Sequence, residues 1–123
     1  MKRIFFTCIA IFLFAATQAQ TTWIVDPTHS TVQFEVSHLA VSSVTGQFTS
    51  YSATVTSKKN NFNGAKITAT IQTASITTNN LERDKHLKDD DFFNVAEYPE
   101  IKFESTSFIA KSDNMYSITG NLT

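Results

Sequence analysis

The sequence predicts an all-β protein, an antiparallel barrel or sandwich with a short helical insertion around residues 79–95. Apolar and polar residues alternate with a period of two along several segments, which is typical of half-buried strands. Turn-forming residues separate these segments at intervals of about 8–12 residues. The alternation stops once, where charged and aromatic residues crowd together, and this interruption marks the insertion. The 123 residues are enough for one domain.

The first nineteen residues have the parts of a secretory signal peptide. Lys2 and Arg3 give a positive start, residues 4–16 form an apolar run, and residues 17–19 form a small-residue cleavage site. The run is shorter than the roughly 20 residues of a transmembrane helix. We therefore expect cleavage after Ala19 and a periplasmic or secreted domain of residues 20–123, with an uncleaved anchor as the alternative.

Net charge, cysteine content and strand length argue against several classes of protein. Loss of residues 1–19 removes two basic residues and leaves 8 Lys and Arg against 11 Asp and Glu, a net charge of −3. This balance gives no reason to expect a nucleic-acid partner. The single cysteine, Cys8, lies in the signal segment, so no disulfide is expected. Most predicted strands are shorter than the ~9–11 residues that span a bilayer, so we expect no stable membrane insertion.

The first strands are predicted over residues 23–25 and 31–38. Pro27 between them holds Asp26 in an extended or turn conformation. The second strand has an apolar face formed by Val32, Phe34, Val36 and His38. Residues 39–44 are less regular and predict a bend or a bulge, and Gly46 predicts a kink at a barrel corner.

The next strand is predicted over residues 48–56, with a bulge after Phe48 because Phe48 is out of phase with Tyr51, Ala53 and Val55. Residues 58–64 are rich in asparagine and predict a loop. The longest strand is predicted over residues 65–76. Its apolar face holds Ile67, Ala69, Ile71 and Thr73.

The insertion begins with Asn79 and Glu82, whose spacing predicts a capping box at the start of a helix. The insertion is predicted as one short helix or as two short helical turns, the second starting within residues 89–91. Asp84 can pair with Lys88 one turn on. Strands over residues 100–109 and 115–122 follow, with a turn at residues 112–114. The total is five or six strands.

A series of short motifs resembles the YceI-like family. They are Trp23-Ile24-Val25-Asp26 with His29-Ser30, Ser37-His38-Leu39 leading to Gly46-Gln47-Phe48, Arg83-Asp84-Lys85-His86-Leu87, Asp91-Phe92-Phe93, Tyr98-Pro99 with Ile101 and Phe103, and Gly120-Asn121-Leu122-Thr123. Each motif alone is weak, but their order and spacing are specific. The resemblance implies an antiparallel lipocalin-like barrel, periplasmic or secreted, that holds a polyisoprenoid or a similar long apolar lipid.

Family members run on for several more strands, and a lipocalin-type barrel needs about eight. The resemblance therefore implies that the barrel of residues 20–123 is incomplete at its C-terminal end.

The apolar residues of the predicted strands and of the insertion could form an ordinary filled core. Given the resemblance, we expect them to line a cavity for an isoprenoid lipid or an isoprenoid quinone, and we expect no other cofactor. Arg83 and His86 would form a polar mouth that meets the ligand's head group. Alternatively, Arg83 would serve as a structural clasp, buried against a carboxylate from a strand. The expected ligand-binding residues are Phe34, Val36, His38, Phe48, Ile67, Ala69, Ile71, Arg83, His86, Phe92, Phe93 and Phe103.

Two other classes stay open. An enzyme could use Arg83, Asp84 and His86 on a small lipid or amide, but no nucleophile with its base is visible, so we assign no catalytic residue. A non-catalytic β module could serve surface assembly.

Histidine spacing predicts no metal site, and residues 89–91 lack the spaced oxygen ligands of a calcium loop. The oligomeric state, a homodimer included, is left open.

Overall fold

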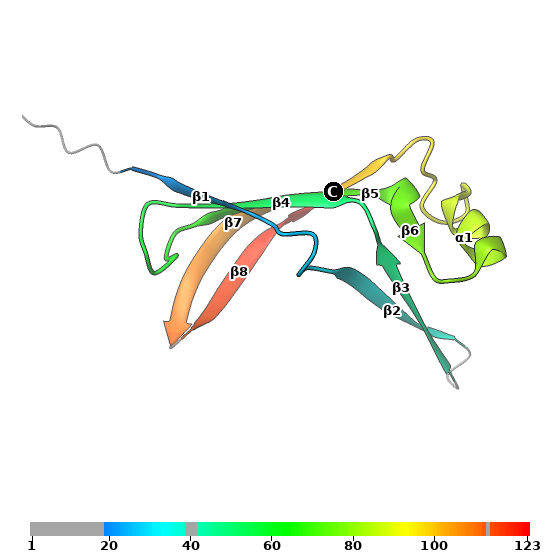
Figure 1. Cartoon of the computed structure of the whole chain (residues 1–123), viewed down its shortest axis with the longest axis horizontal. Coiled ribbons are helices and arrows are strands. Elements are labelled where there is room, and N and C mark those ends of the chain that lie inside the picture. The colour runs from blue at the N-terminus through cyan, green and yellow to red at the C-terminus, as the bar shows by residue number, and fades with distance from the viewer. Residues whose placement is uncertain (1–18, 39–41, 113) are drawn as a thin grey trace, which may run out of the picture.

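The computed structural model describes residues 19–38, 42–112 and 114–123 (Figure 1). These residues form β-strands, one α-helix and one 3-10 turn, which confirms the all-β class with a helical insertion. The elements are β1 (Thr21–Ile24), β2 (Val32–His38), β3 (Ser42–Phe48), β4 (Tyr51–Ser57), β5 (Lys66–Gln72), η1 (Thr73–Ser75), β6 (Ile76–Thr77), α1 (Leu81–Lys88), β7 (Glu100–Ser112) and β8 (Met115–Leu122).

The strands form two antiparallel sheets. The larger has the order β1-β4-β5-β7-β8 and the smaller has the order β2-β3-β6. The larger sheet occupies one end of Figure 1, and the β2–β3 hairpin lies with α1 at the other end. Within the described ranges the two sheets are open, and they do not close into a barrel.

The described chain passes between the two sheets four times. Two of these passages are short neighbouring corners, the first at residues 49–50 between β3 and β4 and the second at η1 between β5 and β6, and they raise the strand count above the predicted five or six. The strand predicted over residues 48–56 corresponds to β4 except at its start, because Phe48 ends β3 and Tyr51 begins β4. The strand predicted over residues 65–76 is not continuous, because η1 separates β5 from β6. The longest strand is β7, with 13 residues.

Hydrogen bonds from distant segments hold the second corner. The buried hydroxyl of Thr73 donates to the carbonyl of Tyr98 at 2.7 Å, and its backbone N–H donates to Pro99 at 3.0 Å. At the first corner the N–H of Thr49 donates to the carbonyl of Ser75 at 3.1 Å. These bonds replace the ladder partners that a continuous strand would have had.

The register of the larger sheet brings its predicted apolar residues to one face. Ala69 lies opposite both Ala53 of β4 and Phe103 of β7, while Ile67 lies opposite Val55 and Ile71 lies opposite Ile101. Directly paired residues of antiparallel strands point to the same side. These side chains are half-buried.

The helical insertion is shorter than predicted. Helix α1 is capped by Asn80, whose side chain accepts a hydrogen bond from the N–H of Arg83 at 3.0 Å; Asn79, the predicted cap, precedes it with a φ of 59°. Of the two predicted forms, the described chain has the single short helix and not the second helical turn. Residues 89–97 instead form hydrogen-bonded turns.

Gly46 lies in the middle of β3, where it pairs with Phe34 of β2, and not at the predicted kink. A β-carbon at this position would overlap the ring of Phe34. The glycine is therefore needed for close approach of this ring to the backbone.

Gly46→Ala is expected to destabilise the chain by about 1–3 kcal/mol, because the methyl group forces the ring of Phe34 out of its position. The free energy of unfolding in urea measures this effect. Thr45→Ala, at the exposed neighbouring residue, is the matched control and should cost less than about 1 kcal/mol. Equal stability of the two variants would contradict the close-approach account.

Candidate functional site

A mainly apolar cavity of about 530 Å³ lies between the β2–β3 hairpin and α1 with its following turn. A volume of this size is within the usual range for small-molecule pockets, about 300–1,000 Å³. Six of the nine residues that line it are apolar. The lining residues are Phe34, Val36, Val44, Thr78, Arg83, His86, Leu87, Phe92 and Phe93.

A chain of aromatic contacts forms the back of the cavity. The ring centroid of Phe48, which is buried, lies 5.7 Å from that of Phe34 and 5.6 Å from that of Phe93, the latter edge to face. The N–H of Phe93 donates to the carbonyl of Leu87 at 3.0 Å, which ties the turn to the end of α1. The apolar wall is therefore held in place by packing and by the backbone.

The front of the cavity is open to solvent. Val36 and Phe92 line it and are each 56% exposed. The ring of His86 meets that of Phe92 at 4.9 Å, edge to face. Neighbouring exposed apolar side chains at the entrance of a cavity are typical of a surface that binds another molecule.

A buried carboxylate fastens α1 to the strand before it. The side chain of Asp84 accepts hydrogen bonds from the N–H of Thr78 at 2.7 Å, the hydroxyl of Thr78 at 2.6 Å and the hydroxyl of Thr77 at 3.0 Å. The hydrogen bond from the Thr78 side chain lowers the pKa of Asp84 below its ordinary value of 3.8, and burial opposes it less strongly. Asp84 is therefore a charged structural anchor.

Arg83 extends the same network to the edge of the cavity. Its Nε donates to the hydroxyl oxygen of Thr78 at 2.7 Å, and Nη2 donates to the carbonyl of Thr78 at 3.0 Å. Among the described residues no ion pair joins Arg83 to a strand carboxylate, so that form of the clasp is wrong. The predicted pair of Asp84 with Lys88 is not formed among the described residues, where the carboxylate of Asp84 accepts hydrogen bonds from Thr77 and Thr78 instead.

The three residues considered for catalysis are not brought together at the cavity. Arg83 and His86 line it, and Asp84 does not. Both oxygens of Asp84 are occupied by Thr77 and Thr78, so this carboxylate is engaged away from the histidine. Across the described ranges, histidine, cysteine and carboxylate side chains do not cluster in a way that could hold a metal ion.

The structure brings half of the predicted ligand-binding residues into the cavity lining. Phe34, Val36, Arg83, His86, Phe92 and Phe93 line it, and Phe48 contacts two of the lining rings from behind. His38 belongs to β2, but its side chain lies outside the described part. The remaining four lie on the larger sheet and do not line this cavity: Ile67, Ala69, Ile71 and Phe103.

Three lining residues were missed by sequence reasoning. Val44 pairs with Val36 across the β2–β3 hairpin, a relation that depends on the register. Leu87 is four residues after Arg83, so the same face of α1 could have revealed it. Thr78 carries no signal of its own in the sequence.

Comparisons with known proteins agree with one another. A family model described as the YceI-like domain matches residues 23–123. Protein YceI of Salmonella newport is 42% identical over 95 residues, which cover 77% of this chain and 49% of that protein. The UPF0312 protein VPA0850 of Vibrio parahaemolyticus is 32% identical over 125 residues, which cover 99% of this chain and 66% of that protein.

Two solved structures have a similar fold. BcnA of Burkholderia cenocepacia superposes with a TM-score of 0.73 at 27% identity, covering 80% of this chain and 62% of BcnA. The YCEI protein of Campylobacter jejuni superposes with a TM-score of 0.59 at 37% identity, covering 80% of this chain and 58% of that protein. The chain spans about half the length of the Salmonella relative. No helix in the described ranges is long and apolar enough to cross a membrane.

Proposed function

This chain belongs to the YceI-like family, and on that premise we propose that it is a binding protein for a long apolar lipid of the polyisoprenoid or isoprenoid-quinone type. The observation that carries the proposal is the cavity of about 530 Å³, walled by six apolar side chains. Its open front at Val36 and Phe92 gives a flexible chain a way in.

Burial of hydrocarbon supplies enough free energy for this function. Each methylene group removed from water contributes about 0.8 kcal/mol, so ten such groups give on the order of 8 kcal/mol before the entropic costs of binding. An isoprenoid chain is apolar along its whole length and needs no polar partner inside the cavity. The apolar walls therefore account for retention of the chain.

Arg83 is the group that would recognise the polar end of such a lipid. Its guanidinium is held at the cavity edge by two hydrogen bonds to Thr78 and is permanently charged. An arginine binds phosphate oxygens through paired hydrogen bonds, and it also donates to a quinone oxygen. His86 lies on the same side of the cavity and offers a second polar contact.

The proposed function is binding without catalysis, in the periplasm or outside the cell. The signal-like segment of residues 1–19 supports this location. An apolar lipid that leaves a membrane needs a protein that shields it from water. A homodimer is compatible with this function, and the oligomeric state can be measured by light scattering.

A series of polyprenyl alcohols from one to eight isoprene units tests the proposal by titration against the chain. We expect affinity to rise about tenfold or more with each added unit until the cavity is full, because each unit buries several further carbon atoms. Affinity that does not depend on chain length would contradict an apolar binding site.

Arg83→Gln is the matched variant for the head group. It should remove any preference for a polyprenyl diphosphate over the alcohol of equal length, while it leaves the dependence on chain length unchanged. A preference that survives in this variant would place the head group elsewhere.

A further inference from the structure

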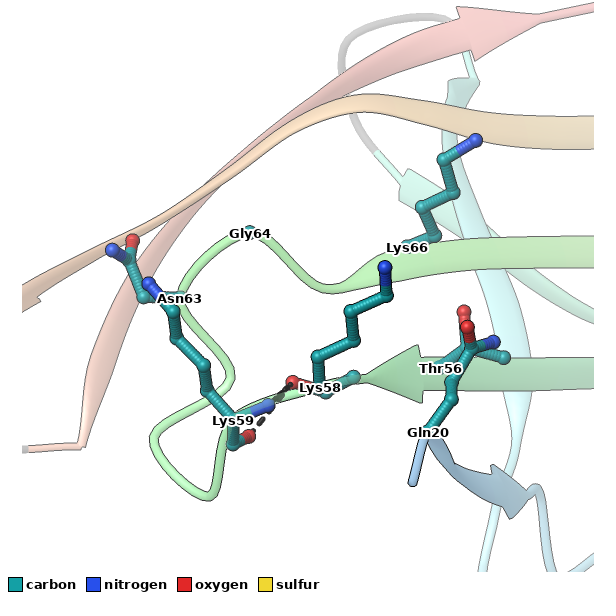
Figure 2. Close-up of a pocket in the computed structure, with 8 residues that line it drawn as sticks. Gln20, Thr56, Lys58, Lys59, Asn63, Gly64 and Lys66 are labelled. Atoms are coloured by element: carbon teal, nitrogen blue, oxygen red, sulfur yellow. Dashed lines mark hydrogen bonds between the residues drawn. The ribbon is translucent and has the colours of Figure 1, made fainter. Parts of the chain in front are cut away.

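Three lysines gather at the end of the larger sheet that lies away from the apolar cavity (Figure 1). Lys58 and Lys59 follow β4, and Lys66 begins β5. Figure 2 shows the side chains of Lys58, just after β4, and Lys66, at the start of β5, extending to the same side. They line a polar hollow of about 610 Å³ with Gln20, Thr56, Ser57, Lys59, Asn63 and Gly64. We name this surface the lysine end.

The charges of the lysine end are not neutralised by ion pairs in the described part of the chain. Residues 36–81 contain these three lysines and no Asp or Glu. The ion pairs of the described residues, Asp26 with His29 and Glu100 with Lys102, lie elsewhere. Because no acidic residue lines the hollow either, the lysine end is a local positive surface on a chain with an acidic excess.

The loop that carries Lys58 and Lys59 is fixed to the sheet. The hydroxyl of Ser57 donates to the carbonyl of Lys59 at 2.7 Å and accepts from its N–H at 3.1 Å. The ring of Phe62 lies 4.8 Å from Trp23 and 6.5 Å from Phe108, and the N–H of Gly64 donates to Phe108 at 2.9 Å. The backbone positions of Lys58 and Lys59 are therefore fixed by hydrogen bonds and by aromatic packing of the loop.

Apolar side chains lie beside the lysine end. A second hollow of about 420 Å³ is shared by Lys59, Lys66 and Ile109 of β7. Ile109 is about half exposed, and Met115, near the turn of the same hairpin, is 64% exposed. Lysine ammonium groups next to exposed apolar side chains are the composition of surfaces that lie in the interfacial region of a membrane.

We propose that the lysine end docks on the surface of an anionic phospholipid bilayer, with the three lysines on lipid phosphates and the side chains of Ile109 and Met115 against the interfacial region. A free phosphate ion would use the lysines alone and would leave the neighbouring apolar side chains without a role. A nucleic acid would also make no use of them. This docking is independent of the lipid cavity, which lies beside α1 at the opposite end of the molecule (Figure 1).

Co-sedimentation with vesicles tests the proposal. The chain should bind vesicles of phosphatidylglycerol mixed with phosphatidylcholine, and bind vesicles of phosphatidylcholine alone far more weakly. The triple variant Lys58→Gln, Lys59→Gln, Lys66→Gln should lose about 100-fold in affinity, since each lysine near an anionic surface contributes about fivefold. Added salt should weaken binding of the wild type, because it screens these charges.

Two further variants keep the test specific. Lys85→Gln, Lys88→Gln and Lys102→Gln together make the same change of net charge at residues that line neither hollow, and should alter vesicle affinity by less than about fivefold. Lys58→Arg, Lys59→Arg and Lys66→Arg keep the charge and should keep the binding. All variants are compared after removal of the expected signal segment, residues 1–19, so this basic and apolar segment makes no contribution to vesicle binding.

Three results would overturn the proposal. One is equal binding to neutral and anionic vesicles. Another is an equal loss in the two glutamine triple variants, which would assign the effect to net charge alone. The third is lysine-dependent binding of inorganic pyrophosphate by a chain that does not sediment with vesicles, which would identify a site for a free anion.

Discussion

Val36→Glu is expected to lower the affinity for a polyprenyl alcohol by about 100-fold or more. Val36 lines the apolar cavity, and a carboxylate there would face hydrocarbon without a partner when the ligand is bound. Covering an unpaired charge costs several kcal/mol, and about 2.7 kcal/mol corresponds to 100-fold. Because Val36 is largely exposed in the free chain, the melting temperature should change little. Titration with the alcohol measures the loss.

Ser37→Glu is the matched control for this prediction. It introduces the same charge one residue further along β2, where the side chain points to the opposite face of the strand. Affinity should stay within about threefold of the wild type, the range of a surface charge of small effect. Equal losses in the two variants would show that the cavity lining does not determine binding.

Asp84→Ala is expected to lower the melting temperature by on the order of 10 °C. The substitution leaves the N–H of Thr78 and the hydroxyls of Thr77 and Thr78 without the acceptor that now binds them. It should also loosen Arg83, whose Nε donates to the same Thr78 hydroxyl. Thermal unfolding followed by circular dichroism measures the first effect, and the diphosphate preference measures the second.

Glu82→Ala is the control, because Glu82 is exposed on the same helix. It should shift the melting temperature by only a few degrees. If Asp84→Ala melts no lower than this control, the buried carboxylate is not an anchor.

The pH dependence of stability gives the anchor a second test. The pKa of Asp84 is lowered in the folded chain, chiefly by the hydrogen bond from Thr78, so folding favours the charged form. This contribution is fully present above the ordinary pKa of 3.8 and is lost as the pH falls through the lowered value. Asp26 and Glu100 have lowered pKa values as well. The acid loss of stability should therefore be reduced, but not abolished, in Asp84→Asn.

Local pattern predicted the strands well and the corners poorly. The alternation of residues 31–38 and the last strand at residues 115–122 correspond closely to β2 and β8. The break at Thr73 could not be predicted in this way, because its hydroxyl is bound by the carbonyl of Tyr98, 25 residues away. A hydrogen bond between distant segments leaves no periodic signal in either of them.

The candidate site shows the same division. Phe34 was expected from the alternation of its strand, and Phe92 and Phe93 were expected from the family motifs. All three line one cavity. The partner of Arg83 was not foreseen, because charge alone suggests a carboxylate, whereas the structure supplies the hydroxyl and carbonyl of Thr78. Thr78 precedes the helix in a segment whose position depends on the smaller sheet.

The lysine end could not be predicted from amino-acid composition either. The net negative charge gave no indication of a basic surface, and a loop separates Lys66 from Lys58 in the sequence. The antiparallel register, which sets Thr56 opposite Lys66, brings these charges together. Register between strands depends on the whole sheet and is therefore harder to predict than the strands themselves.

Native mass spectrometry of the chain, purified without added lipid, tests the central claim most directly. We predict a species heavier than the polypeptide by the mass of one long-chain lipid, which organic solvent extracts and which Val36→Glu lacks. A chain that carries no such lipid, and that takes up no polyprenyl alcohol when one is supplied, would contradict the proposal that the cavity beside α1 is a lipid-binding site.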